Sequence, residues 1–274
     1  MTAIASKEPI SESQPVVESM HGHVLRLTLS LPARRNSLSV EMLTSIGEAL
    51  DQAARNSAVR VVVIAAEGPV FSAGHDLKEL TSHRADKDRG RAHFSSIMEQ
   101  CSALMRSIVR LPKPVIAEIA GVATAAGCQL VASCDLAVAS EEARFQTPGV
   151  HIGLFCSTPM VALSRSVARK HALEMLLTGD MVPASRAAEI GLVNRVVKAE
   201  HLTSETMALA AQIATKSSMT LKTGKEAFQH QFDLPLEEAY GYCAQVMVEN
   251  MLGEDAEEGI GAFLEKRTPN WTDQ

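Results

Sequence analysis

The sequence predicts an α/β protein in which strands alternate with helices, followed by a helical C-terminal region. A continuous β-branched run at 60–66, helical periodicity on both sides of it, and purely helical patterning after residue 200 support this prediction. Apolar strands of this kind are typical of a parallel sheet that is covered on both faces. Strands that alternate with helices indicate repeated βαβ units.

The first half of the chain supplies these units in order. Residues 23–30 alternate between apolar and polar side chains, which predicts a half-exposed strand. A helix follows, with Ser39 as its N-cap and apolar residues at three- and four-residue steps from Val40 to Leu50. The remaining expectations are a strand at 60–66, a polar loop at 81–91, a helix at 92–109, a strand at 114–120, a helix from about 125 and a strand at 135–139.

Beyond residue 144 the pattern becomes irregular and then helical. We expect an irregular segment at 144–157, helices over 164–179 and 183–191, and a short strand at 192–197. Only helices are expected after that strand. The chain therefore divides into a disordered lead-in (1–20), a βαβ core (21–200) and a helical C-terminal region (201–274).

Composition excludes several classes of function. The 274 residues are 46% hydrophobic and 21% charged, as in ordinary globular proteins. A net charge of −6 means that the chain has no overall excess of positive charge with which to attract nucleic acid or an anionic membrane. Five cysteines without CxxC spacing argue against a disulfide framework or a zinc site. Neither a signal peptide nor a run of about 18 apolar residues is present, so we expect a cytoplasmic protein without a membrane partner.

Two turns rich in small residues carry the chemistry. The segment GPVFSAGHDL (68–77) and the segment AEIAGVATAAGCQ (117–129) each lead out of an apolar strand through glycine or alanine. Such turns expose backbone N–H groups and allow a ligand to approach closely. Each turn alone is explained by tight packing of a helix on a sheet. Together they offer N–H groups that could converge on one oxygen.

These segments resemble the crotonase superfamily, the enoyl-CoA hydratase/isomerase proteins, over roughly residues 22–273. The resemblance extends to the C-terminal EGIGAFLEKRTPNW (258–271) and implies a spiral of βαβ units. It also implies that the backbone N–H groups of His75 and Ala126 form an oxyanion hole for a thioester carbonyl. Two preorganised donors stabilise the negative charge that develops there, and one such donor is worth about 3–4 kcal/mol of barrier in other enzymes.

The resemblance further implies contacts to coenzyme A. LPARRNSL supplies two arginines at the predicted entrance, although adjacent arginines between a strand and a helix are also typical of a solvated surface. Lys266 has a second interpretation as a cation at the end of the last helix. The full predicted set is Arg34, Arg35, Ala73, Asp76, Leu77, Lys78, Phe263 and Lys266. No metal, nicotinamide or flavin is implied beyond the coenzyme A moiety of the substrate.

Both glutamates that hydratases of this family use are missing. Gln129 and Gly149 stand at their positions. An amide orients water but does not take its proton, and a missing acid–base group costs about 10²–10⁴-fold in rate. His151 is the leading replacement because an unperturbed histidine titrates near neutrality. Cys156 and Glu118 are weaker candidates, since each is also explained as a structural side chain.

Three functions remain open at this stage. The first is a lyase acting on an enoyl-CoA with substituted acid–base groups, for which replacing both Gln129 and Gly149 by glutamate should raise hydration. The second is decarboxylation or hydrolysis of an acyl-CoA, because the GHDL element is also similar to methylmalonyl-CoA decarboxylase. The third is a non-catalytic protein that binds coenzyme A. The resemblance implies homotrimers, often paired into homohexamers.

Overall fold

A computed structural model describes residues 14–273. Its strands are β1 (Val16–His21), β2 (Val24–Leu29), β3 (Val61–Ala66), β4 (Val70–Ser72), β5 (Val115–Ile119), β6 (Val122–Thr124), β7 (Leu136–Ser140), β8 (Arg144–Gln146), β9 (Val182–Pro183) and β10 (Arg195–Val197). Its α-helices are α1 (Val40–Arg55), α2 (Leu77–Ser82), α3 (Arg91–Arg110), α4 (Ala126–Ser133), α5 (Ser157–Ser166), α6 (Arg169–Thr178), α7 (Ala184–Glu189), α8 (Leu202–Ala214), α9 (Ser218–Gln231), α10 (Leu236–Met251) and α11 (Glu254–Glu265).

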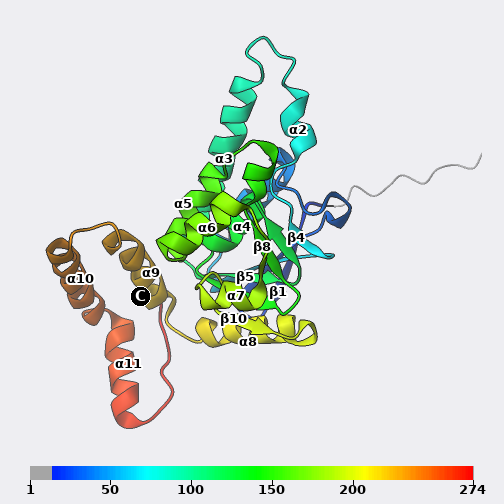
Figure 1. The fold of residues 1–274 in the computed structure, drawn as a ribbon. Helices are drawn as coiled ribbons and strands as arrows, with labels where there is room; N and C mark the ends of the chain where they lie inside the picture. Colours follow the sequence, from blue (N-terminus) through cyan, green and yellow to red (C-terminus); the bar gives the residue numbers. More distant parts are fainter. Residues whose placement is uncertain (1–13, 274) are drawn as a thin grey trace, which may run out of the picture.

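Two sheets form the core, and successive units of the chain contribute a strand to each. The larger sheet has the order β1-β2-β3-β5-β7-β10, and the smaller has the order β4-β6-β8-β9. Strands β3, β5 and β7 of the first sheet are followed along the chain by β4, β6 and β8 of the second. Within residues 14–273, only β1–β2 and β8–β9 pair antiparallel. This stepwise repetition is the predicted spiral of βαβ units (Figure 1).

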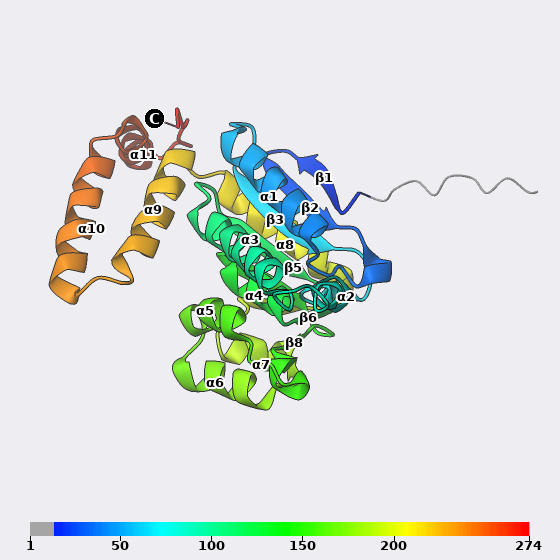
Figure 2. The same cartoon turned by 90° about the horizontal axis from the view of Figure 1, so that it is seen from above.

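Strand β3 shows why the apolar run at 61–66 forms a central strand. Val62 and Ile64 belong to the main hydrophobic cluster, whereas Val61 and Val63 belong to a second cluster with residues of α8. The two faces of the sheet are therefore both covered, as the sequence predicted. Helices α1 and α3 lie on the face opposite α8 (Figure 2). The predicted cap of α1 is confirmed, because Ser39 Oγ accepts the Met42 N–H at 3.2 Å.

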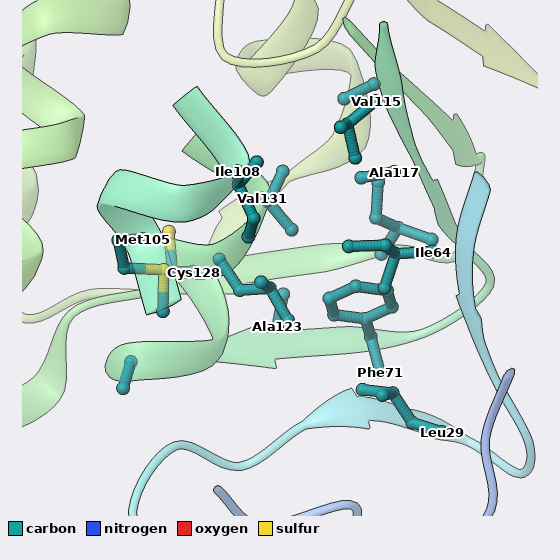
Figure 3. Close-up of a cluster of buried hydrophobic side chains, with 14 of the residues drawn as sticks. Leu29, Ile64, Phe71, Met105, Ile108, Val115, Ala117, Ala123, Cys128 and Val131 are labelled. Atoms are coloured by element: carbon teal, nitrogen blue, oxygen red, sulfur yellow. The ribbon is translucent and has the colours of Figure 1, made fainter. Parts of the chain in front are cut away.

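Side chains from both sheets meet in the main cluster. Figure 3 shows Phe71 of β4 and Ala123 of β6 in the same cluster as Ile64 and Ala117 of the larger sheet. Phe71 is 1% exposed. Phe71 and Ala123 are buried shortly before the two turns rich in small residues. Their burial therefore fixes where each turn begins.

Several sequence-based boundaries are corrected by the structure. The predicted disordered lead-in is wrong for residues 16–20, which belong to β1 and pair with β2; residues 1–13 lie outside the described residues. Helix α2 extends into the loop expected at 81–91. Strand β8 lies within the segment expected to be irregular. The helix expected over 164–179 is interrupted at Val167, an extended residue between α5 and α6.

The helical C-terminal region has two parts. Helix α8 packs on the larger sheet, but α9, α10 and α11 project away from the core in both views (Figures 1 and 2). We call α9–α11 the arm. Lys225 of α9 anchors the arm by donating to Asp135 Oδ2 at 2.6 Å, and Trp271 Nε1 donates to the Thr215 carbonyl at 2.7 Å. Among the described residues, no helix is both long and apolar enough to cross a membrane.

Candidate functional site

The two predicted turns meet at Gly74, between β4 and α2. Gly74 has a φ of +79°, and a Cβ on it would lie 2.8 Å from Ala125 Cβ and 3.0 Å from the Ala126 nitrogen. Glycine is therefore required here both by its conformation and by the approach of the second turn. The turn that precedes His75 thus lies directly against the start of α4.

The two proposed oxyanion-hole donors are free. Neither the His75 nor the Ala126 N–H donates a hydrogen bond within residues 14–273. Ala126 is the first residue of α4, where backbone N–H groups lack partners within the helix and the helix dipole is positive. Its N-cap, Ala125, has no side chain that could accept them and adopts φ 51° and ψ −120°. The Ala125 N–H holds this strained turn in place by donating to the Gln146 carbonyl at 2.9 Å.

The imidazole of His75 is held in one tautomer. Its Nδ1 lies 3.3 Å from the Leu38 carbonyl oxygen, which can only accept a hydrogen bond, so Nδ1 carries the proton. The other nitrogen, Nε2, is buried and has no partner within residues 14–273. Burial lowers the pKa of His75, with opposing contributions from the Leu38 carbonyl and from Glu79. The ring is therefore neutral, with a lone pair on Nε2.

Gln129 lies three residues after Ala126 in α4, which places both residues on the same side of the helix. Its side chain is buried, and its Oε1 has no hydrogen-bond partner within residues 14–273. Thr124, at the end of β6, also has a buried Oγ1 that lacks a partner in the same described range. Sequence reasoning missed Thr124, although a hydroxyl directly before a turn of small residues is a usable signal.

Gly149 lies in the 3₁₀ helix η2 (Pro148–Ile152) and is buried. The Cys156 thiol lies beside it, because a Cβ at position 149 would be 2.9 Å from Cys156 Sγ. Burial raises the pKa of Cys156, which keeps the thiol neutral. Neither glutamate position thus carries a charged group.

The two other candidates for acid–base chemistry have structural partners. His151 is exposed, and its Nε2 lies 2.9 Å from the Thr178 carbonyl at the end of α6. Glu118 of β5 accepts from Arg26 at 2.7 Å and from Thr203 of α8 at 2.9 Å. Glu118 therefore faces α8, and these contacts explain it without catalysis. No hydrogen bond joins His151 to the turn at Gly74 within the described range, and its role stays a prediction.

The predicted coenzyme A residues fall into two groups. The first surrounds the turn at Gly74: the Ala73 N–H donates to the Arg35 carbonyl at 3.0 Å, and the Leu38 N–H donates to the Gly74 carbonyl at 2.8 Å. Arg34, Arg35 and Lys78 are exposed beside it. Asp76 caps α2 by accepting the N–H groups of Lys78 and Glu79, and Leu77 begins that helix.

The second group lies on the arm. Phe263 is 83% exposed on α11, and Lys266 is the C-cap residue of that helix. Helix α11 is distant from α2 in both views (Figures 1 and 2). The chain therefore does not bring Phe263 or Lys266 to its own turn at Gly74. Within residues 14–273, no cluster of three His, Cys, Asp or Glu side chains could hold a metal ion.

Comparison with known sequences gives a consistent result. The family model described as Enoyl-CoA hydratase/isomerase matches residues 19–274. The mouse protein named "Enoyl-CoA hydratase domain-containing protein 3, mitochondrial" is 46% identical over 264 residues, which cover 96% of this chain and 86% of the relative. The 2,3-dehydroadipyl-CoA hydratase of Escherichia coli is 32% identical over 257 residues, which cover 93% of this chain and 98% of the relative.

Solved structures agree with the sequences. The crystal structure of human enoyl Coenzyme A hydratase domain-containing protein 3 matches with a TM-score of 0.89 at 47% identity, covering 94% of this chain and 100% of that one. The crystal structure of an enoyl-CoA hydratase from Mycobacterium smegmatis matches with a TM-score of 0.89 at 46% identity, covering 94% of this chain and 98% of that one.

These matches confirm the resemblance and the fold that were predicted from the sequence. The relatives named as domain-containing protein 3 are called mitochondrial, which conflicts with the predicted cytoplasmic location. The matched family model covers almost the whole chain, including both turns and the arm. The chain belongs to the enoyl-CoA hydratase/isomerase family.

Proposed function

We propose that the protein binds an acyl-CoA thioester with its carbonyl oxygen between the N–H groups of His75 and Ala126. The observation that carries this proposal is the contact at Gly74, which sets the two unpartnered N–H groups on adjoining turns. Donors that are already in place at a developing oxyanion cost no reorganisation during the reaction. A thioester that forms an enolate or a related oxyanion is the substrate class that fits.

The usual hydration route is not favoured by the side chains around this site. Gln129 and Gly149 supply no carboxylate to activate water or to protonate the α-carbon. His75 offers a neutral Nε2, but this atom is buried. We therefore expect crotonyl-CoA hydration to be slower by about 10²-fold or more than in a protein with both glutamates.

Decarboxylation is the second candidate, and the lack of a carboxylate at positions 129 and 149 favours it. When the bond between the α-carbon and the carboxylate breaks, its electron pair passes into the thioester enolate and CO₂ leaves. No base has to remove a proton from carbon in that step. The enolate then takes a proton from solvent. The same oxyanion hole would serve thioester hydrolysis, and a protein that binds acyl-CoA without turnover is the remaining alternative.

The arm fits a role in assembly and in coenzyme A binding. Phe263 and Lys266 belong to α11, which lies on the other side of the molecule from α2 and the turn at Gly74 (Figures 1 and 2). They reach a coenzyme A moiety only if the arm of one copy meets the core of another. We therefore propose a homotrimer or homohexamer, which sedimentation equilibrium of the purified chain would test.

Calorimetry with butyryl-CoA, an unreactive saturated thioester, tests the binding site. Ala126→Pro removes one donor at a helix position where proline is tolerated, and Ala126→Gly is the matched control that keeps the N–H. We expect Ala126→Pro to weaken binding and Ala126→Gly to preserve it, with circular dichroism showing that both variants fold. Absence of butyryl-CoA binding by the wild-type protein would contradict the proposal.

Product analysis separates the candidate reactions. Crotonyl-CoA, methylmalonyl-CoA and butyryl-CoA would be incubated with the protein, and hydrated, decarboxylated and hydrolysed products would be measured by mass spectrometry. Turnover of one thioester class, reduced about 10²-fold or more in Ala126→Pro, would assign the reaction to this oxyanion hole. Binding without any product would indicate the non-catalytic alternative.

A further inference from the structure

The space beside Gly149 is filled by the segment 154–156. A Cβ at position 149 would lie 2.9 Å from Cys156 Sγ, 3.0 Å from the Leu154 carbonyl oxygen and 3.2 Å from the Cys156 nitrogen. Carbon atoms in close-packed protein interiors do not approach neighbouring atoms this closely without displacing them. Any side chain at position 149, and not only a long or charged one, therefore requires the Cys156 thiol or the backbone of 154–156 to shift.

Hydrogen bonds hold this segment in place. The Leu154 N–H donates to the Gly149 carbonyl at 2.9 Å. The Cys156 carbonyl accepts the Met160 N–H at 2.9 Å, which fixes Cys156 at the start of α5. A side chain at position 149 would therefore have to break contacts with η2 and α5 together.

The same contacts link position 149 to α4. Helices α4 and α5 pack together, Cys128 and Cys156 both belong to the main hydrophobic cluster, and Cys128 directly precedes Gln129. Burial raises the pKa of Cys128 to about 12. The thiols of Cys128 and Cys156 are therefore neutral, as is the amide of Gln129, and none of these groups takes a proton from water.

We propose that Cys156 is a specificity-determining residue whose thiol occupies the space needed by a side chain at position 149, and thereby keeps a carboxylate away from the bound thioester. This inference rests on the proposed binding of an acyl-CoA at the oxyanion hole. The proposal changes the expected effect of Gln129→Glu and Gly149→Glu, which together should not be enough to restore hydration. That pair requires the removal of the Cys156 thiol as well.

The steric part is tested by unfolding, without any substrate. Gly149→Ala would be measured in the wild-type background and in the Cys156→Ala background. Overpacking predicts that Gly149→Ala lowers Tm by about 3–10 °C in the wild-type background. The loss should be clearly smaller in Cys156→Ala, although the Leu154 carbonyl still restricts the site. Equal losses in both backgrounds would overturn the proposal.

The functional part is tested with crotonyl-CoA. We expect the triple variant Gln129→Glu/Gly149→Glu/Cys156→Ala to hydrate it at least about tenfold faster than Gln129→Glu/Gly149→Glu. The matched control Gln129→Glu/Cys156→Ala, which lacks the second carboxylate, should stay at the lower rate. Equal rates for the double and triple variants would show that Cys156 does not set this specificity.

Butyryl-CoA calorimetry on the same variants separates this inference from the proposed function. If the wild-type protein does not bind butyryl-CoA, the proposed function fails, while the unfolding result still decides the steric claim. If the triple variant folds and binds butyryl-CoA but shows no gain in hydration, the specificity role of Cys156 is contradicted while acyl-CoA binding stands.

Discussion

The core and the arm bury their apolar residues to very different extents. The main cluster of the core joins side chains from both sheets and from α1, α3 and α4. In the arm, the only buried residues of α9–α11 are Ala227, Ala239, Asp255 and Ala262. Several large apolar side chains of the arm are exposed instead, including Phe228, Leu236, Tyr240, Leu252, Phe263 and Leu264.

This difference shows which part of the fold one chain can stabilise by itself. Exposed apolar area as extensive as that of the arm marks an interaction surface in a folded protein. The core carries the oxyanion-hole turns and depends on its own packing. The arm depends on a few anchoring contacts and, in our proposal, on other copies of the chain. Substitutions in the two regions should therefore affect different properties.

The largest expected contrast is between two phenylalanines. Phe71 is 1% exposed, whereas Phe263 is 83% exposed. Phe71→Ala should reduce the free energy of unfolding by about 3–5 kcal/mol because it removes a buried side chain and leaves a cavity. Phe263→Ala should leave the core intact and weaken assembly. Urea unfolding would measure the first effect and sedimentation the second. Loss of assembly in Phe71→Ala but not in Phe263→Ala would contradict the assignment of assembly to the arm.

A smaller effect is expected at the anchor between the arm and the core. Lys225 Nζ donates to Asp135 Oδ2, to the Ile108 carbonyl and to the Lys113 carbonyl, and its side chain is 8% exposed. Lys225→Met leaves the buried Asp135 carboxylate without its cationic partner and should cost about 3 kcal/mol of stability. Lys222→Met, on the exposed side of the same helix, is the control and should cost little. Equal stability of both variants would show that this anchor is unimportant.

The smallest expected effect is a pH dependence at His75. Because burial lowers the pKa of His75 below its ordinary value of 6.5, the unfolded chain takes up a proton before the folded chain does as the pH falls. The stability contributed by neutral His75 is present above pH 6.5 and is lost as the pH falls through the folded pKa. His75→Gln should therefore lose less unfolding free energy than the wild type between pH 7 and pH 5. Parallel curves for the two proteins would contradict this assignment.

Regular patterns explain what the sequence could predict. The apolar steps of 40–55 and the β-branched run of 61–66 each extend over several residues, so periodicity identified α1 and β3. Strands β4, β6 and β8 have three residues each, too few for any period to appear. The smaller sheet was therefore missed, although it positions both turns.

The site divides in a similar way. Small residues at strand ends predicted the turns at Gly74 and Ala126, because local conformation limits which residues fit there. The contact between Gly149 and Cys156 follows from how η2 and the start of α5 pack together, and no local pattern encodes it. The position of Phe263 could not be predicted either, since a motif shows a resemblance but not which copy of the chain provides the contact.

The most direct test of the account is the infrared stretching frequency of the thioester carbonyl in bound butyryl-CoA, labelled with ¹³C at that carbon. Two hydrogen bonds from His75 and Ala126 should lower the frequency on binding, and Ala126→Pro should lose a large part of the shift while Ala126→Gly keeps it. An unshifted carbonyl in the wild-type complex, or the same shift in all three proteins, would contradict the proposed oxyanion hole.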